Sequence, residues 1–244
     1  MAYRTILFDA DMTLFDFKAA ETIALEQTLS AHAYPCDPHI IARYSAINDS
    51  LWKAFERGEI SREVLTETRF MKLFDTLGIH GDPAAFNQEY MSNMSQQPLL
   101  LDGALELCRY LSAEYRLYII TNGITKTQQS RFARSQLTPY FQGLFVSEET
   151  GSQKPHRAYF DYVSAHIPQW EPKSTLVVGD SLSSDIQGAI NYGLDSCWFN
   201  PEHLPYSLSQ PCTYEIHRLE ELNPILSEKQ DSVLEINNKN YLSH

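Results

Sequence analysis

The stretch ILFDADMT, residues 6–13, decides which fold is expected for this chain of 244 residues. Three apolar residues come directly before a pair of aspartates, Asp9 and Asp11. An apolar run this short is typical of a buried strand, and open parallel α/β sheets build their sites at the carboxyl ends of their strands. Two buried neighbouring carboxylates cost free energy unless a cation or a shared proton compensates them. Taken alone, the same residues also fit an Asx-type turn after a strand.

Three further segments favour a strand that ends in a functional site. Residues 116–123 read RLYIITNG, an apolar strand followed by a hydroxyl, an amide and a glycine. Residues 175–180 read TLVVGD, a strand that ends in an acid, and Asp185 follows five residues later. Residues 151–155, GSQKP, place Lys154 in a loop. Because the carboxyl ends of parallel strands share one edge of a sheet, these groups are expected to converge on one crevice.

The pattern of apolar residues changes along the chain. Residues 16–98 show helical spacing only, as in Phe70, Leu73, Phe74 and Leu77. From residue 99 onward, helical and strand patterns alternate, which is typical of a parallel sheet with helices on both faces. The expected strands are 3–9, 116–121, 144–146, 175–180 and 196–199, and the expected helices of this part are 104–111, 125–135, 158–166 and 185–192.

We therefore predict an α/β fold with a Rossmann-like parallel sheet core, formed by residues 1–15 and 99–226. An all-helical cap domain, residues 16–98, is inserted into this core. A polar tail without periodicity, residues 227–244, follows it.

Composition excludes several classes of function. A net charge of −12 argues against a nucleic acid polymer as partner and against an anionic membrane surface. The chain carries no signal segment and no run of 18 apolar residues, so a cytoplasmic protein is expected. Its four cysteines form no C-x-x-C pair and are interpreted as reduced, with two of them in apolar surroundings.

In this order, the four segments resemble the haloacid dehalogenase-like superfamily of phosphotransferases, and the resemblance spans residues 3–226. Finer similarity, to the bacterial house-cleaning pyrimidine 5′-nucleotidases, lies in FDADMTLF (8–15), IITNG (119–123), VSEETG (146–151) and CWFN (197–200). The resemblance implies a helical cap domain and a Mg²⁺-dependent phosphomonoesterase. One departure is Met12, where an acidic residue is common in those enzymes.

Two acids are assigned to catalysis. A carboxylate can attack a phosphoryl group and form an acyl phosphate, and Asp9 is the expected nucleophile. Asp11, two residues on, would protonate the leaving alcohol and then accept a proton from the attacking water. Similarity to the family supports both roles, since its phosphatases carry an acid at each position. The dehalogenase branch lacks the second acid, so Asp11 argues against dehalogenation.

The remaining candidates would bind Mg²⁺ and phosphate. Asp180 would complete a Mg²⁺ site with the Asp9 carboxylate and the Asp11 main-chain carbonyl, because an oxygen-only ligand set suits that ion. Asp185 either joins this site, directly or through water, or is an acid that the helix dipole favours. The phosphate-binding candidates are Thr121, Asn122, Gly123 and Lys154.

Alternatives to a nucleotidase remain open at this stage. A sugar phosphatase or an N-acylneuraminate-type phosphatase of the same superfamily is the first of them. A phosphomutase, a phosphoryl-accepting receiver domain and an inactive binding module are others, although a receiver is shorter and lacks a helical insertion. His156 and Trp52 are interpreted as structural. A small phosphomonoester is the expected partner, bound by a monomer or a homodimer.

Overall fold

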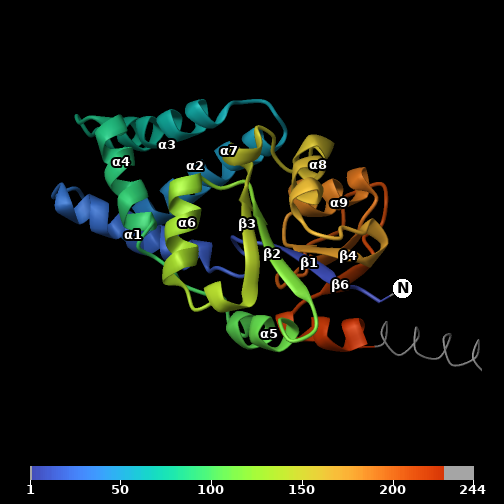
Figure 1. Cartoon of the computed structure of the whole chain (residues 1–244). Coiled ribbons are helices and arrows are strands. Elements are labelled where there is room, and N and C mark those ends of the chain that lie inside the picture. Colours follow the sequence, from blue (N-terminus) through green and yellow to red (C-terminus); the bar gives the residue numbers. More distant parts are fainter. Residues whose placement is uncertain (1, 228–244) are drawn as a thin grey trace, which may run out of the picture. The chain divides into compact units, whose positions relative to one another are not determined.

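The computed structural model describes residues 2–227 and divides the chain into two compact units (Figure 1). The first unit contains residues up to Phe15, Leu100–Thr125 and the residues from Gln136 onward. The second contains Asp16–Leu99 and Lys126–Ser135. The predicted tail, apart from Ser227, lies outside the described residues. The division into core, cap and tail stays a prediction at its boundaries.

The first unit is built on one six-stranded sheet in which all paired strands are parallel. The strand order is β3-β2-β1-β4-β5-β6. The strands are β1 (Thr5–Asp9), β2 (Arg116–Thr121), β3 (Phe141–Val146), β4 (Thr175–Gly179), β5 (Asp195–Phe199) and β6 (Tyr214–Ile216). This sheet confirms the predicted α/β fold with a Rossmann-like core.

The strand order places a topological switch point between β1 and β4. The chain moves outward on one side from β1 to β2 and β3, and on the other side from β4 to β5 and β6. Phe8 pairs with Val178, so Asp9 and Gly179 end their strands at the same level. Ligand sites of open α/β sheets lie in the crevice at such a point. The fold therefore brings the ends of β1 and β4 together.

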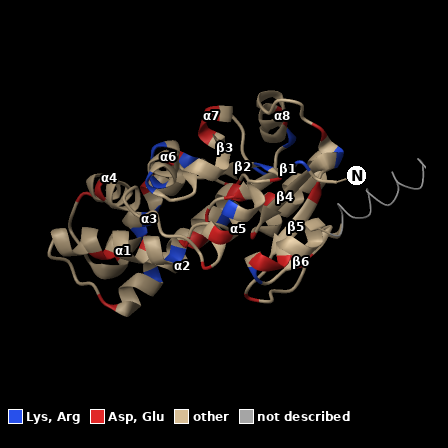
Figure 2. Cartoon of the chain, turned by 60° about the horizontal axis from the view of Figure 1, so that its bottom comes forward, with Lys and Arg blue, Asp and Glu red and all other residues tan. Residues whose placement is uncertain are grey.

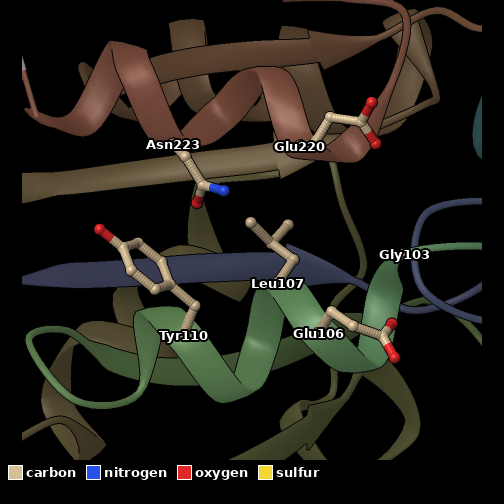
Figure 3. Close-up of a pocket in the computed structure, with 6 residues that line it drawn as sticks. All are labelled: Gly103, Glu106, Leu107, Tyr110, Glu220 and Asn223. Atoms are coloured by element: carbon tan, nitrogen blue, oxygen red, sulfur yellow. The ribbon is translucent and has the colours of Figure 1, made fainter.

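Helices cover both faces of the sheet (Figure 1). On one face, α8 (Arg157–His166) and α9 (Gln187–Tyr192) pack against strand residues such as Leu7, Ile120 and Val177. On the other, α5 (Ala104–Leu111) lies beside η4 (Leu219–Glu221) and the residues that follow it (Figure 3). The shorter elements are α7 (Ser147–Thr150), η1 (Thr138–Tyr140), η2 (Pro172–Ser174) and η3 (Leu182–Ile186).

Three details differ from the sequence-based expectation. Strand β6 was not predicted, because its three residues form a strand only by pairing with β5. Strand β3 begins at Phe141, three residues before the expected start, with a register shift opposite Leu117 and Tyr118. The α-helix expected from Asp185 begins at Gln187, because η3, a turn of π-helix, occupies Leu182–Ile186. Such turns are frequent at functional sites.

The second unit is helical, as predicted. Its helices are α1 (Phe17–Ala31), α2 (Pro38–Glu56), α3 (Arg62–Leu77) and α4 (Pro83–Met94), together with most of α6 (Thr125–Arg134). Side chains of Asp16, Asp37, Ser61 and Asp82 accept hydrogen bonds from the first turns of α1 to α4, which satisfies backbone donors there. Arg131 of α6 donates from Nε to the carbonyl of Gln97 at 3.0 Å.

Apolar packing holds α1 to α4 together. The buried cluster includes Tyr44, Phe70, Phe74, Phe86 and Tyr90, whose rings meet edge-on or stacked. Trp52 packs beside a separate small cluster of Leu51, Phe55 and Leu65, which agrees with a structural role. Among residues 2–227, none of the helices has both the length and the apolar character needed to cross a membrane.

A buried polar network crosses the centre of this helical unit. Arg69 donates from Nε and Nη2 to the side-chain oxygen of Asn87, at 2.8 and 2.6 Å. Asn48 donates to Glu21 at 2.7 Å. Burial raises the pKa of the Glu21 carboxyl, and hydrogen bonds from Ser45 and Asn48 oppose this only in part. An ionised Glu21 therefore costs the folded state free energy.

We predict that Glu21→Gln stabilises the protein at pH 8 more than at pH 5. The folded pKa of Glu21 lies above its ordinary value of 4.5, so the folded state binds the proton more tightly than the unfolded state. The penalty in the unmodified chain is complete above the folded pKa and is relieved as the pH falls through it toward 4.5. Gln keeps the acceptor for Asn48 without the charge. Urea denaturation at both pH values measures the difference.

The matched control is Glu26→Gln, which removes an exposed carboxylate from the same helix. Its effect on the free energy of unfolding should be small at both pH values. A gain from Glu21→Gln that is the same at pH 5 and pH 8 would contradict this account of the network.

Candidate active site

The centre of the site is a buried ammonium group. Lys154, whose side chain is 1% exposed, donates from Nζ to Asp9 Oδ1 at 2.6 Å and to Asp185 Oδ1 at 2.7 Å. Its third donor contact is the carbonyl of Ile120 at 2.9 Å. Three acceptors use all three N–H groups of a lysine. The structure thus brings one predicted phosphate ligand into contact with two predicted metal ligands.

Burial and the neighbouring charges shift the pKa of Lys154 in opposite directions. Burial alone would lower the pKa of Lys154, but the charges of Asp185 and Asp9 outweigh it and raise that pKa. Lys154 therefore stays protonated at neutral pH. Burial also raises the pKa of Asp9, to about 8, although the attraction of Lys154 opposes the rise. A further cation near Asp9 would favour the ionised carboxylate that a nucleophile needs.

Asp9 and Asp185 belong to a cluster of three carboxylates. Side-chain oxygens of Asp9, Asp180 and Asp185 lie within 4.8 Å of one another, the one group of this kind found among the described residues. Two of these carboxylates contact the one ammonium and the third lies near them, which leaves negative charge that a divalent cation would balance. All donors are oxygens, the ligands that Mg²⁺ prefers. These residues therefore fit a magnesium ion.

The contacts of Asp185 distinguish it from the other two acids. Its Oδ1 accepts from Lys154, and its Oδ2 accepts from the backbone N–H of Ser181 at 3.1 Å. The side chain is 1% exposed, and both of its oxygens already have protein donors. We infer that Asp185 orients Lys154, and that direct coordination of a metal falls chiefly to Asp9 and Asp180.

Glycine 179 makes the approach of Asp185 possible. A Cβ added at Gly179 would lie 2.3 Å from Asp185 Cγ and Oδ2, far inside contact distance. Asp185 thus fills the space beside the end of β4 that any other residue at position 179 would occupy. The glycine at this position therefore has a steric cause.

Asp11 lies in the turn after β1, and its carboxylate does not belong to the cluster of three. The turn is closed by a hydrogen bond from the Met12 N–H to the carbonyl of Phe15 at 2.9 Å. Met12 has a φ of 63°, the left-handed region that L side chains rarely adopt. The turn is partly exposed at Asp11, which suits a group that exchanges protons with substrate and water.

The end of β2 organises the loop that carries Lys154. The Asn122 side chain donates to the Lys154 carbonyl and accepts from the Lys154 N–H, both at 2.9 Å. The Thr121 hydroxyl accepts from the Gly123 N–H at 3.0 Å. The sequence predicted Asn122 as a phosphate ligand. Its side chain has a different task, because it fixes the lysine loop against β2.

One acidic residue makes a contact at this edge of the sheet that was not predicted from the sequence. Glu148 of α7 accepts from the backbone N–H of Thr125 at 2.6 Å, at the first residue of α6. A carboxylate at this position interacts favourably with the helix dipole. In the sequence, only the resemblance of VSEETG (146–151) to the nucleotidases pointed to Glu148.

Acidic residues are spread over both units (Figure 2). The charges closest to Lys154 are the carboxylates of Asp9 and Asp185. A separate pocket of about 470 Å³ lies between α5 and residues 220–223 (Figure 3). Its lining residues are Gly103, Glu106, Leu107, Tyr110, Glu220 and Asn223. None of them is a predicted site residue.

Comparison with known proteins agrees with this geometry. Residues 6–199 match the model of the haloacid dehalogenase-like hydrolase family, and the chain belongs to that family. It is 44% identical to the HAD-hydrolase YfnB of Bacillus subtilis over 92% of this chain and 96% of that protein. The pyrimidine 5′-nucleotidase PynA of Streptococcus pneumoniae is 39% identical, over 91% and 94% of the two chains.

A solved structure gives the same result. The crystal structure of Bacillus subtilis YfnB bound to magnesium matches with a TM-score of 0.89 and 43% identity. The match covers 93% of this chain and 99% of that one. The fold, including the helical insertion, is therefore that of a haloacid dehalogenase-like hydrolase.

We predict that Gly179→Ala lowers the free energy of unfolding by about 1–3 kcal/mol, the usual cost of overpacking a filled site. The reason is the 2.3 Å approach of the new Cβ to Asp185. Gly143→Ala in β3 is the control, because its Cβ would meet only a Tyr118 ring carbon at 3.3 Å. Urea denaturation measures both variants.

A double-mutant cycle assigns the loss to Asp185. In an Asp185→Gly background the added methyl group has no side chain to meet, so Gly179→Ala should cost much less. An equal cost in both backgrounds would show that the clash is not what makes glycine necessary.

Proposed function

We propose that this chain is a Mg²⁺-dependent phosphomonoesterase that forms an aspartyl phosphate on Asp9, with pyrimidine nucleoside 5′-monophosphates as its preferred substrates. The observation that carries the proposal is the contact of Lys154 with Asp9 and Asp185 beside Asp180, at the switch point of the sheet. A binding module has no need of a nucleophilic carboxylate paired with a buried ammonium.

Asp9 would act as nucleophile. One Asp9 oxygen attacks phosphorus, an Asp9–phosphoryl bond forms, and the bond from phosphorus to the ester oxygen breaks. Asp11 gives its proton to the departing alcohol. In the second step, Asp11 takes a proton from a water whose oxygen attacks phosphorus, so that inorganic phosphate leaves and the Asp9 carboxylate is restored.

The other residues would supply position and charge. Lys154 compensates the charge of the phosphoryl oxygens and of Asp9, and Asp185 keeps its ammonium in place. Thr121 offers its hydroxyl at the end of β2. Asp9 and Asp180 would hold Mg²⁺, with the Asp11 carbonyl, and the ion would neutralise charge on the phosphoryl group. Positioning and charge stabilisation are almost all that phosphoryl transfer requires of a protein.

The substrate preference rests on similarity to relatives. PynA, 39% identical, is named as a pyrimidine 5′-nucleotidase. The likeness extends along nearly the whole of both chains, so it includes the helical insertion as well as the sheet. We therefore favour uridylate and thymidylate over purine nucleotides, with sugar phosphates and N-acylneuraminate-type phosphates as the rival substrates.

A substrate panel tests this proposal. Release of inorganic phosphate from uridylate, thymidylate, adenylate and glucose 6-phosphate is measured with Mg²⁺ and with excess chelator. We expect the highest kcat/KM for the two pyrimidine nucleotides, because a pocket fitted to one ring excludes a second, an effect of about 1–3 kcal/mol. Chelation should abolish turnover and Mg²⁺ should restore it.

Two outcomes would contradict different parts of the proposal. A sugar phosphate that exceeds every pyrimidine nucleotide tenfold in kcat/KM would overturn the nucleotidase assignment but leave the phosphatase assignment intact. Full turnover in excess chelator would overturn the role of the carboxylate cluster.

We predict that Asp11→Asn slows release of a poor leaving group more than that of a good one. Uridylate releases an alkoxide that needs a proton, so its rate should fall about 10²- to 10⁴-fold. p-Nitrophenyl phosphate releases a stabilised phenolate and should lose less in its first step. Asp102→Asn, at an exposed acid, is the control. Equal losses for both substrates would contradict general acid catalysis by Asp11.

A further inference from the structure

The stretch CWFN, residues 197–200, resembles the nucleotidases but has no part in the chemistry described so far. Trp198 lies near the end of β5 and pairs with Gly179, the last residue of β4. Its side chain is buried, with 1% exposed. Among the fully buried side chains of the described chain it is the largest. The sheet register thus places the indole next to Asp180, which directly follows Gly179.

Three hydrogen bonds hold Asp180 from two sides. The Trp198 indole donates from Nε1 to the Asp180 carbonyl at 2.8 Å. From the other side, the Thr13 hydroxyl accepts from the Asp180 N–H at 3.1 Å and donates to Asp180 Oδ1 at 3.3 Å. Thr13 is fully buried. Both peptide groups flanking the Asp180 side chain therefore have a fixed side-chain partner.

Trp198 and Thr13 contact Asp180 at a point where regular secondary structure ends. Asp180 lies between the last residue of β4 and η3, so neither a strand ladder nor a helix fixes its backbone. A ligand in such a position loses orientational freedom on binding a metal unless other groups have already removed that freedom. Trp198 comes from the strand on one side of β4, and Thr13 follows the strand on the other.

Asn200, the last residue of CWFN, organises the turn that follows the strand carrying the indole. Asn200 accepts from the Leu204 N–H at 2.9 Å and donates to the Leu204 carbonyl at 3.0 Å, which closes the turn after β5. Asn200 also donates to Glu215 of β6 at 2.7 Å. The Tyr206 ring, two residues beyond this turn, meets the Trp198 ring edge-on at 5.6 Å. The Tyr206 ring and the closed turn after β5 thus support the strand end that carries Trp198.

We propose that Trp198 and Thr13 are positioning residues for the magnesium ligand Asp180, and that they tighten Mg²⁺ binding by holding its main chain and carboxylate in place before the ion arrives. The proposal rests on the proposed function, since it takes Asp180 as a metal ligand. Partners of this kind, one step removed from a metal, typically change its affinity by about 10- to 100-fold.

The first test compares two tryptophan variants of the full chain. Trp198→Phe keeps an aromatic ring and removes the N–H donor. Trp170→Phe is the matched control, because Trp170 lies in the same unit and packs against Tyr192, away from the carboxylates. Isothermal titration with Mg²⁺ alone should give a dissociation constant about 10-fold higher for Trp198→Phe and unchanged within twofold for Trp170→Phe.

Thr13 gives a second and independent pair of variants. Thr13→Ser keeps the hydroxyl and should bind Mg²⁺ within threefold of the unmodified chain, whereas Thr13→Val, of similar shape, should lose about 10-fold. For Trp198→Phe, the Mg²⁺ concentration that half-activates turnover should rise, while KM for uridylate at saturating Mg²⁺ stays the same. A general loss of structure would change both constants.

A third measurement does not depend on whether the Trp198 variant folds. In the double variant Trp52→Phe and Trp170→Phe, Trp198 is the sole tryptophan left of the three in the sequence. Its indole N–H, seen by nuclear magnetic resonance, should exchange slowly with solvent and shift on addition of Mg²⁺. Fast exchange, or no response to Mg²⁺, would overturn the proposal.

The outcomes separate this inference from the proposed function. If the unmodified chain binds Mg²⁺ and releases phosphate but Trp198→Phe matches Trp170→Phe, the positioning role is wrong and the phosphatase stands. If Trp198→Phe weakens Mg²⁺ binding but no phosphomonoester is hydrolysed, the positioning role stands and the proposed function is wrong. An unmodified chain that binds no Mg²⁺ would overturn both.

Discussion

The rest of the site depends on one buried ammonium group, that of Lys154 between the carboxylates of Asp9 and Asp185. A buried ion pair is stable only if its geometry is good and its remaining donors are satisfied. Here all three N–H groups have acceptors, and the Asn122 side chain fixes the backbone of the lysine. The ammonium links residues from the end of β1, the end of β2 and the segment after β4, so it constrains several loops at once.

The strand order makes this arrangement possible. β1 and β4 are neighbours at the switch point, so Asp9, which ends β1, lies beside Asp180, which directly follows β4. Gly179 leaves the space through which Asp185 reaches the lysine. The geometry of the site therefore depends on the strand order and on the absence of a Cβ atom at Gly179. The same strand order explains why Trp198, on the next strand, can contact Asp180.

Much of this could be predicted from the sequence, because apolar runs that end in polar residues give the strands and their carboxyl ends directly. The sheet core, the helical insertion and the proximity of Asp9 and Asp180 were predicted from that pattern, and the structure brings Lys154 into contact with Asp9. The contacts of individual side chains could not be predicted from it. That Asn122 binds the lysine loop depends on loop geometry, which spacing does not encode, and β6 exists only through its pairing with β5.

The central claim is that Asp9 becomes phosphorylated during turnover, and chemical trapping tests it most directly. The enzyme is mixed with uridylate and Mg²⁺, quenched in acid within the first turnover, and reduced with borohydride, which converts an aspartyl phosphate to homoserine. Peptide mass spectrometry then locates the change. The account predicts homoserine at residue 9, dependent on substrate. Phosphate release without modification at residue 9, or modification of a different carboxylate, would contradict it.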